Sequence, residues 1–179
     1  MFNQFARAAR LAVLEAARDA QNRAAAEVTD EHLLLALINQ PETTSAELLR
    51  QAGVTSAKVD AAFRTAERKA GLSDAEAATL LRELGIDLDE VVARVEQSLG
   101  EKALVGVARP RRHHRPPFAP TAKDIIRGAL SQARSLRHKE LSNEHLLLAL
   151  AEHEGVAGQL LAAHGLSYLD VRAQLAKAS

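Results

Sequence analysis

The sequence predicts an all-α protein built from two copies of one helical unit, and three observations support this. The string E-H-L-L-L-A-L occupies Glu31–Leu37 and returns unchanged at Glu144–Leu150, which is typical of a structural unit used twice. Hydrophobic residues make up 47% of the chain but aromatic residues only 3%, which favours closely packed helices over sheets. Apolar residues also recur at three- and four-residue steps, the period of an amphipathic helix.

In the first copy, this spacing predicts a helix over about residues 3–20. A polar stretch follows, and Thr29 or Asp30 is the expected N-cap of a second helix that runs to about Asn39. The second helix is apolar on almost every side. We therefore expect it to lie at the centre of its unit.

Helix-breaking residues mark the helix ends in the second half of the unit. Pro41 ends the second helix, and Thr43 or Thr44 opens a short third helix through residue 52. Gly53 stands at the C′ position, where a left-handed conformation commonly ends a helix. A fourth helix is predicted over about residues 56–69.

The second copy repeats this order. We expect helices over residues 120–136, 143–153, a third ending at 164 with Gly165 at C′, and 167–177. Ser167 and Asp170 have the spacing of a capping box. The register runs without a gap from Phe5 and Phe118 to the end of the repeated string. One residue is then lost, after which Gly53 matches Gly165.

The stretch between the copies predicts a further element. Leu80–Ile86 resembles the second half of the unit, and Ser73 with Glu76 forms a capping box before it. We interpret this stretch as an inserted helical hairpin, because the E-H-L-L-L-A-L string has no third copy. The expected organisation is a first repeat over 1–70, the hairpin over 71–100, a linker over 101–117 and a second repeat over 118–179.

Charge and composition exclude several classes. The 23 basic and 23 acidic residues cancel, so no net field would draw the chain to nucleic acid or an anionic membrane. The absence of cysteine excludes disulfides, thiol catalysis and cysteine-ligated metals. The N-terminus does not read as a secretion signal, and no apolar run approaches the roughly 18 residues of a membrane span. We expect a soluble, cytoplasmic protein.

Two units that each read as a helix, then [T/S]-x-E-H-L-L-L-A-L, then L-L-x3-G, resemble the Clp N-terminal domain. This is the doubled helical repeat at the front of the Clp/Hsp100 unfoldases. The resemblance covers residues 2–65 and 118–177 and includes a Phe near the start of each unit. It implies the Clp N-domain fold, with two pseudo-repeats of a four-helix unit and here an inserted hairpin.

The chain departs from those unfoldases in three ways. No G-x4-G-K-[S/T] phosphate loop occurs, so their ATPase modules are missing. About fifty residues separate the repeats, where family members have a short linker. The Thr that commonly precedes the motif glutamate is Asp30 in one copy and Asn143 in the other. The chain is therefore similar to standalone N-domain proteins and to the plant ClpT accessory proteins, and we expect no enzyme activity and no cofactor.

Glu31 and Glu144 stand at helix starts, and two interpretations remain open. A carboxylate there complements the positive end of the helix dipole for about 0.3–1 kcal/mol. The resemblance implies instead that they bind the guanidinium of phosphoarginine, a degradation mark, as the matching glutamates of ClpC N-domains do; a carboxylate accepts two parallel N–H bonds from a guanidinium. Asp30 adds charge that would repel the phosphate, whereas Asn143 is neutral, which makes Glu144 the better candidate.

His32 and His145 follow these glutamates inside leucine-rich helices. We interpret both as packed, hydrogen-bonded residues, because no nucleophile, base or metal-spaced cluster accompanies them. We expect no metal site, although His113 and His114 with His138 offer zinc as an alternative.

Residues 108–117 contain three prolines and four arginines, which predict an extended, exposed linker. Contact of Arg109–Arg115 with nucleic acid or an acidic partner is the alternative. No aromatic residue is interleaved for base stacking, which disfavours nucleic acid.

Phe5 and Phe118 occupy equivalent places, and we expect both in the core. For Phe2, the resemblance implies an apolar contact surface, because a Phe at this place in ClpC-type N-domains lines the surface that cyclic-peptide antibiotics occupy.

Three hypotheses follow for function. The first is a non-enzymatic binding module of the Clp proteolytic system that recognises substrates, degradation marks or adaptors, with Glu31 and Glu144 as polar anchors. The second is a decoy or resistance protein that sequesters cyclic-peptide antibiotics through Phe2. The third is a structural accessory subunit of a Clp protease complex. The expected partners are Clp unfoldase or protease components, substrates and adaptors.

Overall fold

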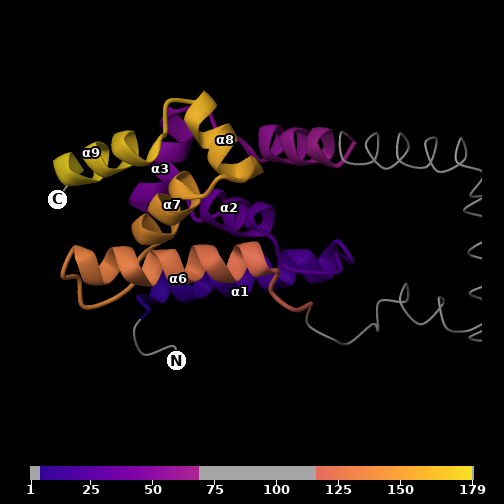
Figure 1. Cartoon of the computed structure of the whole chain (residues 1–179), viewed down its shortest axis with the longest axis horizontal. Coiled ribbons are helices and arrows are strands. Elements are labelled where there is room, and N and C mark those ends of the chain that lie inside the picture. Colours follow the sequence, from indigo (N-terminus) through magenta and orange to yellow (C-terminus); the bar gives the residue numbers. More distant parts are fainter. Residues whose placement is uncertain (1–4, 69–115, 179) are drawn as a thin grey trace, which may run out of the picture. The chain divides into compact units, whose positions relative to one another are not determined.

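The computed structural model describes residues 5–68 and 116–178, and every regular element in this part of the chain is a helix (Figure 1). The named helices are α1 (Arg7–Asn22), α2 (Asp30–Ile38), α3 (Thr44–Gln51), α6 (Pro120–Ser135), α7 (Asn143–Glu152), α8 (Val156–Ala163) and α9 (Tyr168–Ala178). Residues 56–68 form a further helix. The all-α prediction is confirmed.

The predicted helix ends are largely confirmed. Thr29 and Thr43 are the N-caps of α2 and α3, and the Thr43 hydroxyl accepts a hydrogen bond from Ala46 N. Gly53 and Gly165 adopt the left-handed conformation, with φ of 70° and 72°. The capping box before α9 also forms: Ser167 N–H donates to the Asp170 carboxylate over 3.2 Å and Asp170 N–H to the Ser167 hydroxyl over 3.4 Å.

The start of the first helix was predicted too early. The helix begins at Arg7 rather than at residue 3, because Phe5 is extended and forms a parallel β-bridge with Leu141. Ala6 N–H donates to the Leu141 carbonyl over 2.8 Å. A helix that included these residues would lose this link to the other repeat.

The second repeat makes the reciprocal link. Phe118 pairs with Val28, whose N–H donates to Pro117 O over 2.8 Å and whose carbonyl accepts from Ala119 N over 2.9 Å. Each repeat therefore begins with an extended residue bonded to the segment that precedes the repeated helix of the other. Phe5 is buried and Phe118 half-buried, and both pack on the core as predicted.

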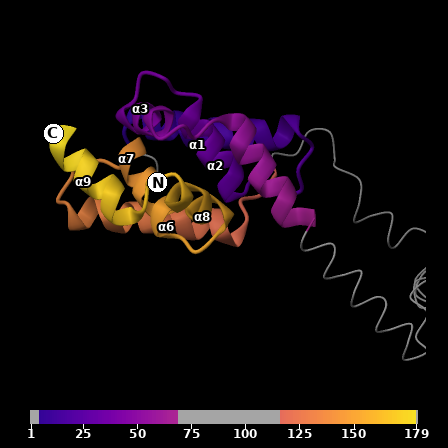
Figure 2. The same ribbon diagram turned by 90° about the horizontal axis from the view of Figure 1, so that it is seen from above.

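The repeated helices α2 and α7 lie in the middle of the packed helices. In Figure 1, α1 and α6 form the layer on one side of them, and α3, α8 and α9 lie on the other. Figure 2 shows the first repeat, in indigo to magenta, beside the second, in orange to yellow. α2 packs against α7, and α2 and α7 each contact both outer layers. Their apolar sequence on all sides follows from this position.

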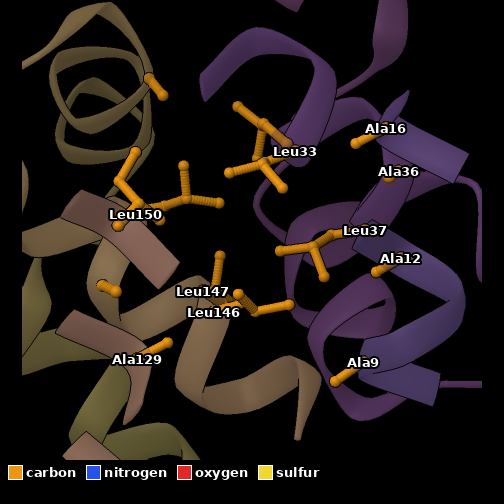
Figure 3. Close-up of a cluster of buried hydrophobic side chains, with 14 of the residues drawn as sticks. Ala9, Ala12, Ala16, Leu33, Ala36, Leu37, Ala129, Leu146, Leu147 and Leu150 are labelled. Atoms are coloured by element: carbon orange, nitrogen blue, oxygen red, sulfur yellow. The ribbon is translucent and has the colours of Figure 1, made fainter. Parts of the chain in front are cut away.

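One continuous core joins the two repeats. Leu33 and Leu37 of α2 point toward Leu146 and Leu147 of α7 (Figure 3). Behind α2, buried small residues of α1 line its contact face: Ala9, Ala12, Ala16 and Ala20. Alanines at a helix contact let the two axes approach closely, which explains how a core with few aromatic residues is filled.

Residues Met1–Phe63 and Arg115–Ser179 form one compact unit, and Arg64–His114 form a second. The first unit thus contains both copies of the repeated string. The predicted hairpin over 71–100 and all but the last two residues of the predicted linker over 101–117 lie outside the described residues.

Two non-glycine residues at equivalent places have left-handed backbones. Ala24 follows α1 with φ of 53°, and Arg137 follows α6 with φ of 56°. Ala25 N–H donates to Ala20 O and His138 N–H to Ala133 O, both over 2.9 Å, so each turn closes its helix in the Schellman manner. A residue with a Cβ costs about 1–2 kcal/mol in this conformation relative to glycine. Replacing it with glycine gains only part of that energy, because glycine has more conformational entropy to lose on folding.

Ala24→Gly is accordingly expected to raise the free energy of unfolding by about 0.5–1 kcal/mol. Gly165→Ala should lower it by about 1 kcal/mol, because its φ is 72° although nothing lies within 4 Å of the added methyl. Urea denaturation of both variants measures this. Destabilisation by Ala24→Gly would contradict the backbone argument.

Candidate binding site

The repeated glutamates occupy the second position of their helices. Glu31 follows Asp30 at the start of α2, and Glu144 follows Asn143 at the start of α7. Both residues are half-buried. Unpaired backbone N–H groups at these ends favour a carboxylate, which gives both glutamates a structural role whatever else they bind.

Each helix start is fixed by a capping box that uses histidine. Thr29 N–H donates to His32 Nδ1 over 3.1 Å, and Ser142 N–H donates to His145 Nδ1 over 3.0 Å. The hydroxyl of each cap residue lies 2.8 Å from the same nitrogen. Histidine takes the place that Glu or Gln holds in the usual box. The predicted packed, hydrogen-bonded histidines are confirmed, with exposures of 4% and 2%.

These hydrogen bonds determine the tautomer of the His32 and His145 imidazole rings. A nitrogen that accepts a backbone N–H carries no proton, so the neutral imidazole has its proton on Nε2. In the second repeat, His145 Nε2–H donates to His138 Nδ1 over 2.9 Å, and the rings meet edge to face. The first repeat has Ala25 at the place of His138. Burial lowers the pKa of both His32 and His145, and the neighbouring His138 lowers that of His145 further.

Stability is therefore expected to fall in mild acid. The unfolded histidines take up protons near pH 6.5, whereas His32 and His145 resist protonation until a lower pH because their folded pKa values are depressed. Stability is complete above pH 6.5 and is lost as the pH falls toward the folded values, by up to about 1.4 kcal/mol per pH unit for each histidine.

Urea denaturation between pH 7.5 and 5.5 measures this loss. The control is the double variant His32→Gln/His145→Gln, because glutamine preserves the capping box without titrating. Its stability should change less over this range. An equal loss in the variant and the wild type would refute the assignment to these histidines.

Three carboxylates surround one guanidinium at Glu31. Arg23 Nη1 lies 3.3 Å from Glu31 Oε1 and 3.0 Å from Asp60 Oδ1, and Arg23 Nε lies 2.8 Å from Asp19 Oδ2. The hydrogen bond to Asp60 raises the pKa of Arg23, against the opposing effect of burial. The Glu31 side chain is only 16% exposed, whereas that of Arg23 is 40% exposed. The first copy of the motif thus already holds an arginine of its own chain.

The second copy lacks this arrangement. Leu136 stands at the place of Arg23, Gln132 at that of Asp19 and Arg172 at that of Asp60. Leu136 packs on the core, and Gln132 donates to Glu152 over 2.9 Å. The side chains of Glu144 and Arg172 make no hydrogen bond or ion pair with any residue of the described ranges. The second copy therefore has a carboxylate, Glu144, and a cation, Arg172, that are paired with no side chain in the described part of the chain.

The residues before the two glutamates face the opposite repeat. Asp30 is buried, and its Oδ2 lies 3.5 Å from Ala157 N in the first turn of α8. Asn143 is also buried, and its amide donates to Gln40 Oε1 over 2.9 Å. The Asp30 charge is therefore directed to the positive end of α8. The ion pair with Arg23 distinguishes Glu31 from Glu144 more directly than the charge of Asp30 does.

Several further candidates from the sequence lie outside the described residues. They are Phe2, His113, His114 and the run Arg109–Arg115. Within residues 5–68 and 116–178, no group of three or more His, Cys, Asp or Glu side chains could hold a metal ion. His138 is instead engaged with His145. An open groove beside the start of α3, lined by residues including Thr44, Glu47 and Gln174, was not indicated by the sequence.

Comparison with known proteins gives consistent matches. The model of the Clp repeat (R) N-terminal domain matches residues 4–70, 68–164 and 117–179. The chain is 29% identical over 150 residues to the ATP-dependent Clp protease ATP-binding subunit ClpC of Staphylococcus aureus. The matched stretch covers 83% of this chain and 13% of that protein. It is 36% identical over 101 residues to the chloroplastic chaperone protein ClpC2 of Oryza sativa, covering 55% of this chain and 10% of that one. The chain therefore spans about a tenth of the length of these relatives.

Solved structures share the fold. The N-terminal domain of the chaperone ClpD from Arabidopsis thaliana superimposes with a TM-score of 0.55 at 19% identity, with all of both chains covered. A chain from a structural study of a malarial protein secretion system gives a TM-score of 0.56 at 13% identity, covering 98% of this chain and 94% of that one. Among the described residues of the present chain, no helix is long and apolar enough to cross a membrane.

Proposed function

The chain belongs to the Clp repeat N-terminal domain family, and from this premise we propose that it is a non-enzymatic binding module of the Clp proteolytic system. We propose further that it recognises arginine-borne degradation marks, phosphoarginine above all, with Glu144 as the polar anchor. In this role it would hold marked substrates for a Clp unfoldase.

The contact between Arg23 and Glu31 carries this proposal. It supplies an internal example of a guanidinium at the repeated glutamate, with Nη1 and Oε1 3.3 Å apart. The repeat places Glu144 in the same position on α7, where Leu136 replaces the internal arginine. A guanidinium from a partner would therefore meet a Glu144 that pairs with no described residue, whereas Glu31 already pairs with Arg23.

The exchange of Asp60 for Arg172 supports the phosphorylated form of the ligand. In the first repeat, Asp60 lies 3.0 Å from the guanidinium. Arg172 follows Val171 as Asp60 follows Val59, and both valines are fully buried, so the two helices have the same register. A cation at this place suits a phosphoryl group on the guanidinium, because arginine binds phosphate through paired, charge-assisted hydrogen bonds.

Isothermal titration with phosphoarginine tests the proposal. We expect binding by the wild type and a loss of roughly 10- to 100-fold on Glu144→Gln, the cost of removing a charge-assisted pair. Glu31→Gln is the matched control at the equivalent position and should leave the affinity nearly unchanged. If the wild type showed no heat of binding, or if Glu144→Gln bound phosphoarginine with unchanged affinity, the proposal would be wrong.

Two further variants separate the guanidinium from the phosphate. Leu136→Arg would place a guanidinium in the second repeat where Arg23 stands in the first, and should weaken binding by competition for Glu144. Arg172→Asp should weaken phosphoarginine more than free arginine, because only the former carries the phosphate. Equal effects on both ligands would assign Arg172 no part in phosphate recognition.

A further inference from the structure

Helix α1 exposes two leucines on one face. Leu11 is 44% exposed and Leu14 is 48% exposed, whereas the buried face of the same helix is formed largely by alanines. Residues three apart on a helix are surface neighbours, so the two side chains form one apolar patch. Scattered single leucines on a surface need no explanation, but an adjacent pair on an otherwise polar face does.

Three arginines and one glutamate lie beside this patch, and the glutamate, Glu15, already accepts a hydrogen bond from Gln40 over 3.2 Å. Arg7 lies four residues before Leu11, Arg10 four before Leu14, and Arg18 four after Leu14, so each adjoins a leucine on the helix surface. All three arginines are exposed. None forms an ion pair or side-chain hydrogen bond within residues 5–68 and 116–178. We refer to Arg7, Arg10, Leu11, Leu14 and Arg18 together as the α1 face.

The equivalent helix of the second repeat has no such face. Asp124 and Arg127 stand at the places of Leu11 and Leu14, and they form an ion pair of 2.6 Å with both side chains more than half exposed. The fold therefore accepts a charged pair at these positions. Because packing does not require leucines there, the apolar pair on α1 needs another reason.

We propose that the α1 face is a docking surface for an acidic, leucine-bearing helix of a partner protein. The leucine pair offers an apolar contact for leucines that recur at helical spacing on the partner. The three arginines, which pair with no residue that the structure describes, complement carboxylates at the rim of the partner helix and would steer its approach. The patch contains none of the residues assigned to phosphoarginine, so the two proposals stand or fall separately.

The same features disfavour a membrane as the occupant. Interfacial helices present a broad apolar face with aromatic residues to the lipid. The α1 face offers only two leucines and no aromatic side chain, because the main apolar face of α1 is buried in the core. The charge of the chain is also balanced, with 23 basic and 23 acidic residues.

A synthetic helical peptide with leucines at three- and four-residue steps and glutamates around them is the probe. Its fluorescence anisotropy is titrated with the full chain, and a peptide with lysine in place of each glutamate is the control. We expect the acidic peptide to bind, with weaker affinity at high salt, and the basic peptide to remain free. No binding of the acidic peptide would overturn the proposal.

The matched variant is Leu11→Asp/Leu14→Arg, which transfers the ion pair of α6 to α1. It should retain the helical circular dichroism of the wild type and bind the acidic peptide at least about tenfold more weakly. The variant Arg7→Gln/Arg10→Gln/Arg18→Gln should lose most of the salt dependence. Unchanged affinity in the leucine variant would refute the assignment, as would sedimentation of the chain with phosphatidylglycerol vesicles but no binding of the peptide.

Discussion

Leu147→Ala is expected to lower the free energy of unfolding by about 3–5 kcal/mol, the usual cost of a cavity in a well-packed core. Leu147 is fully buried in α7, at the centre of the packed helices, and faces the leucines of α2 (Figure 3). A loss of this size is a large fraction of the stability of an ordinary domain. Leu34, its equivalent in α2, is also fully buried and should show a similar loss.

Urea denaturation followed by circular dichroism measures this effect. Leu169→Ala is the control, because Leu169 is 72% exposed and its replacement should cost less than about 0.5 kcal/mol. The shared core also predicts that Leu147→Ala shifts the transition of the first repeat. If the first repeat instead unfolded at an unchanged urea concentration, the two repeats would be independent and the shared core would be wrong.

Gly158→Ala is expected to destabilise the protein by about 2–3 kcal/mol through overpacking. A methyl group at Gly158 would lie 2.0 Å from the His153 carbonyl oxygen and 3.1 Å from that of Leu150. Both are backbone atoms, which cannot rotate away. The first repeat has the buried Ala46 at this place, and its connection before this helix, residues 39–43, is two residues longer than residues 153–155 of the second repeat.

Gly128→Ala provides the matched control on α6. The same methyl group would there meet only Ala149 Cβ at 3.5 Å, an ordinary contact. Because alanine has the higher helix propensity, this change should stabilise the protein by up to about 1 kcal/mol. The two glycine substitutions should therefore shift the thermal midpoint in opposite directions. A stabilising Gly158→Ala would show that the connection between α7 and α8 relaxes freely.

Local signals in the sequence predicted most of the helices. Thr43 and Gly53 bracket α3 as expected, because a hydroxyl cap and a left-handed glycine act on their own neighbours in the chain. Phe5 was assigned to a helix because its spacing from Ala9 fits the helical period. Its true conformation depends on the β-bridge to Leu141, and a partner so distant in the sequence leaves no trace in local periodicity.

The candidate site shows the same division. The repeat identified Glu31 and Glu144, and the i, i+4 spacing of Asp19 and Arg23 could have indicated their ion pair. The approach of Arg23 to Asp60 joins two helices, and the sequence alone offered no signal for it. The charge of Asp30 was expected beside Glu31, but the packing of the two repeats directs it to α8.

The sequence by itself determined the all-α class, the doubled unit and the family, because these depend on periodicity, capping and an unchanged motif. Only the tertiary structure decided that the equal motifs have unequal surroundings. Arg23 pairs with Glu31 in the first copy, whereas Leu136 stands at its place in the second copy and no guanidinium of the described residues pairs with Glu144. The physical reason is that a repeated core specifies the same backbone twice, while the charges around each glutamate come from residues outside the motif that packing alone brings together.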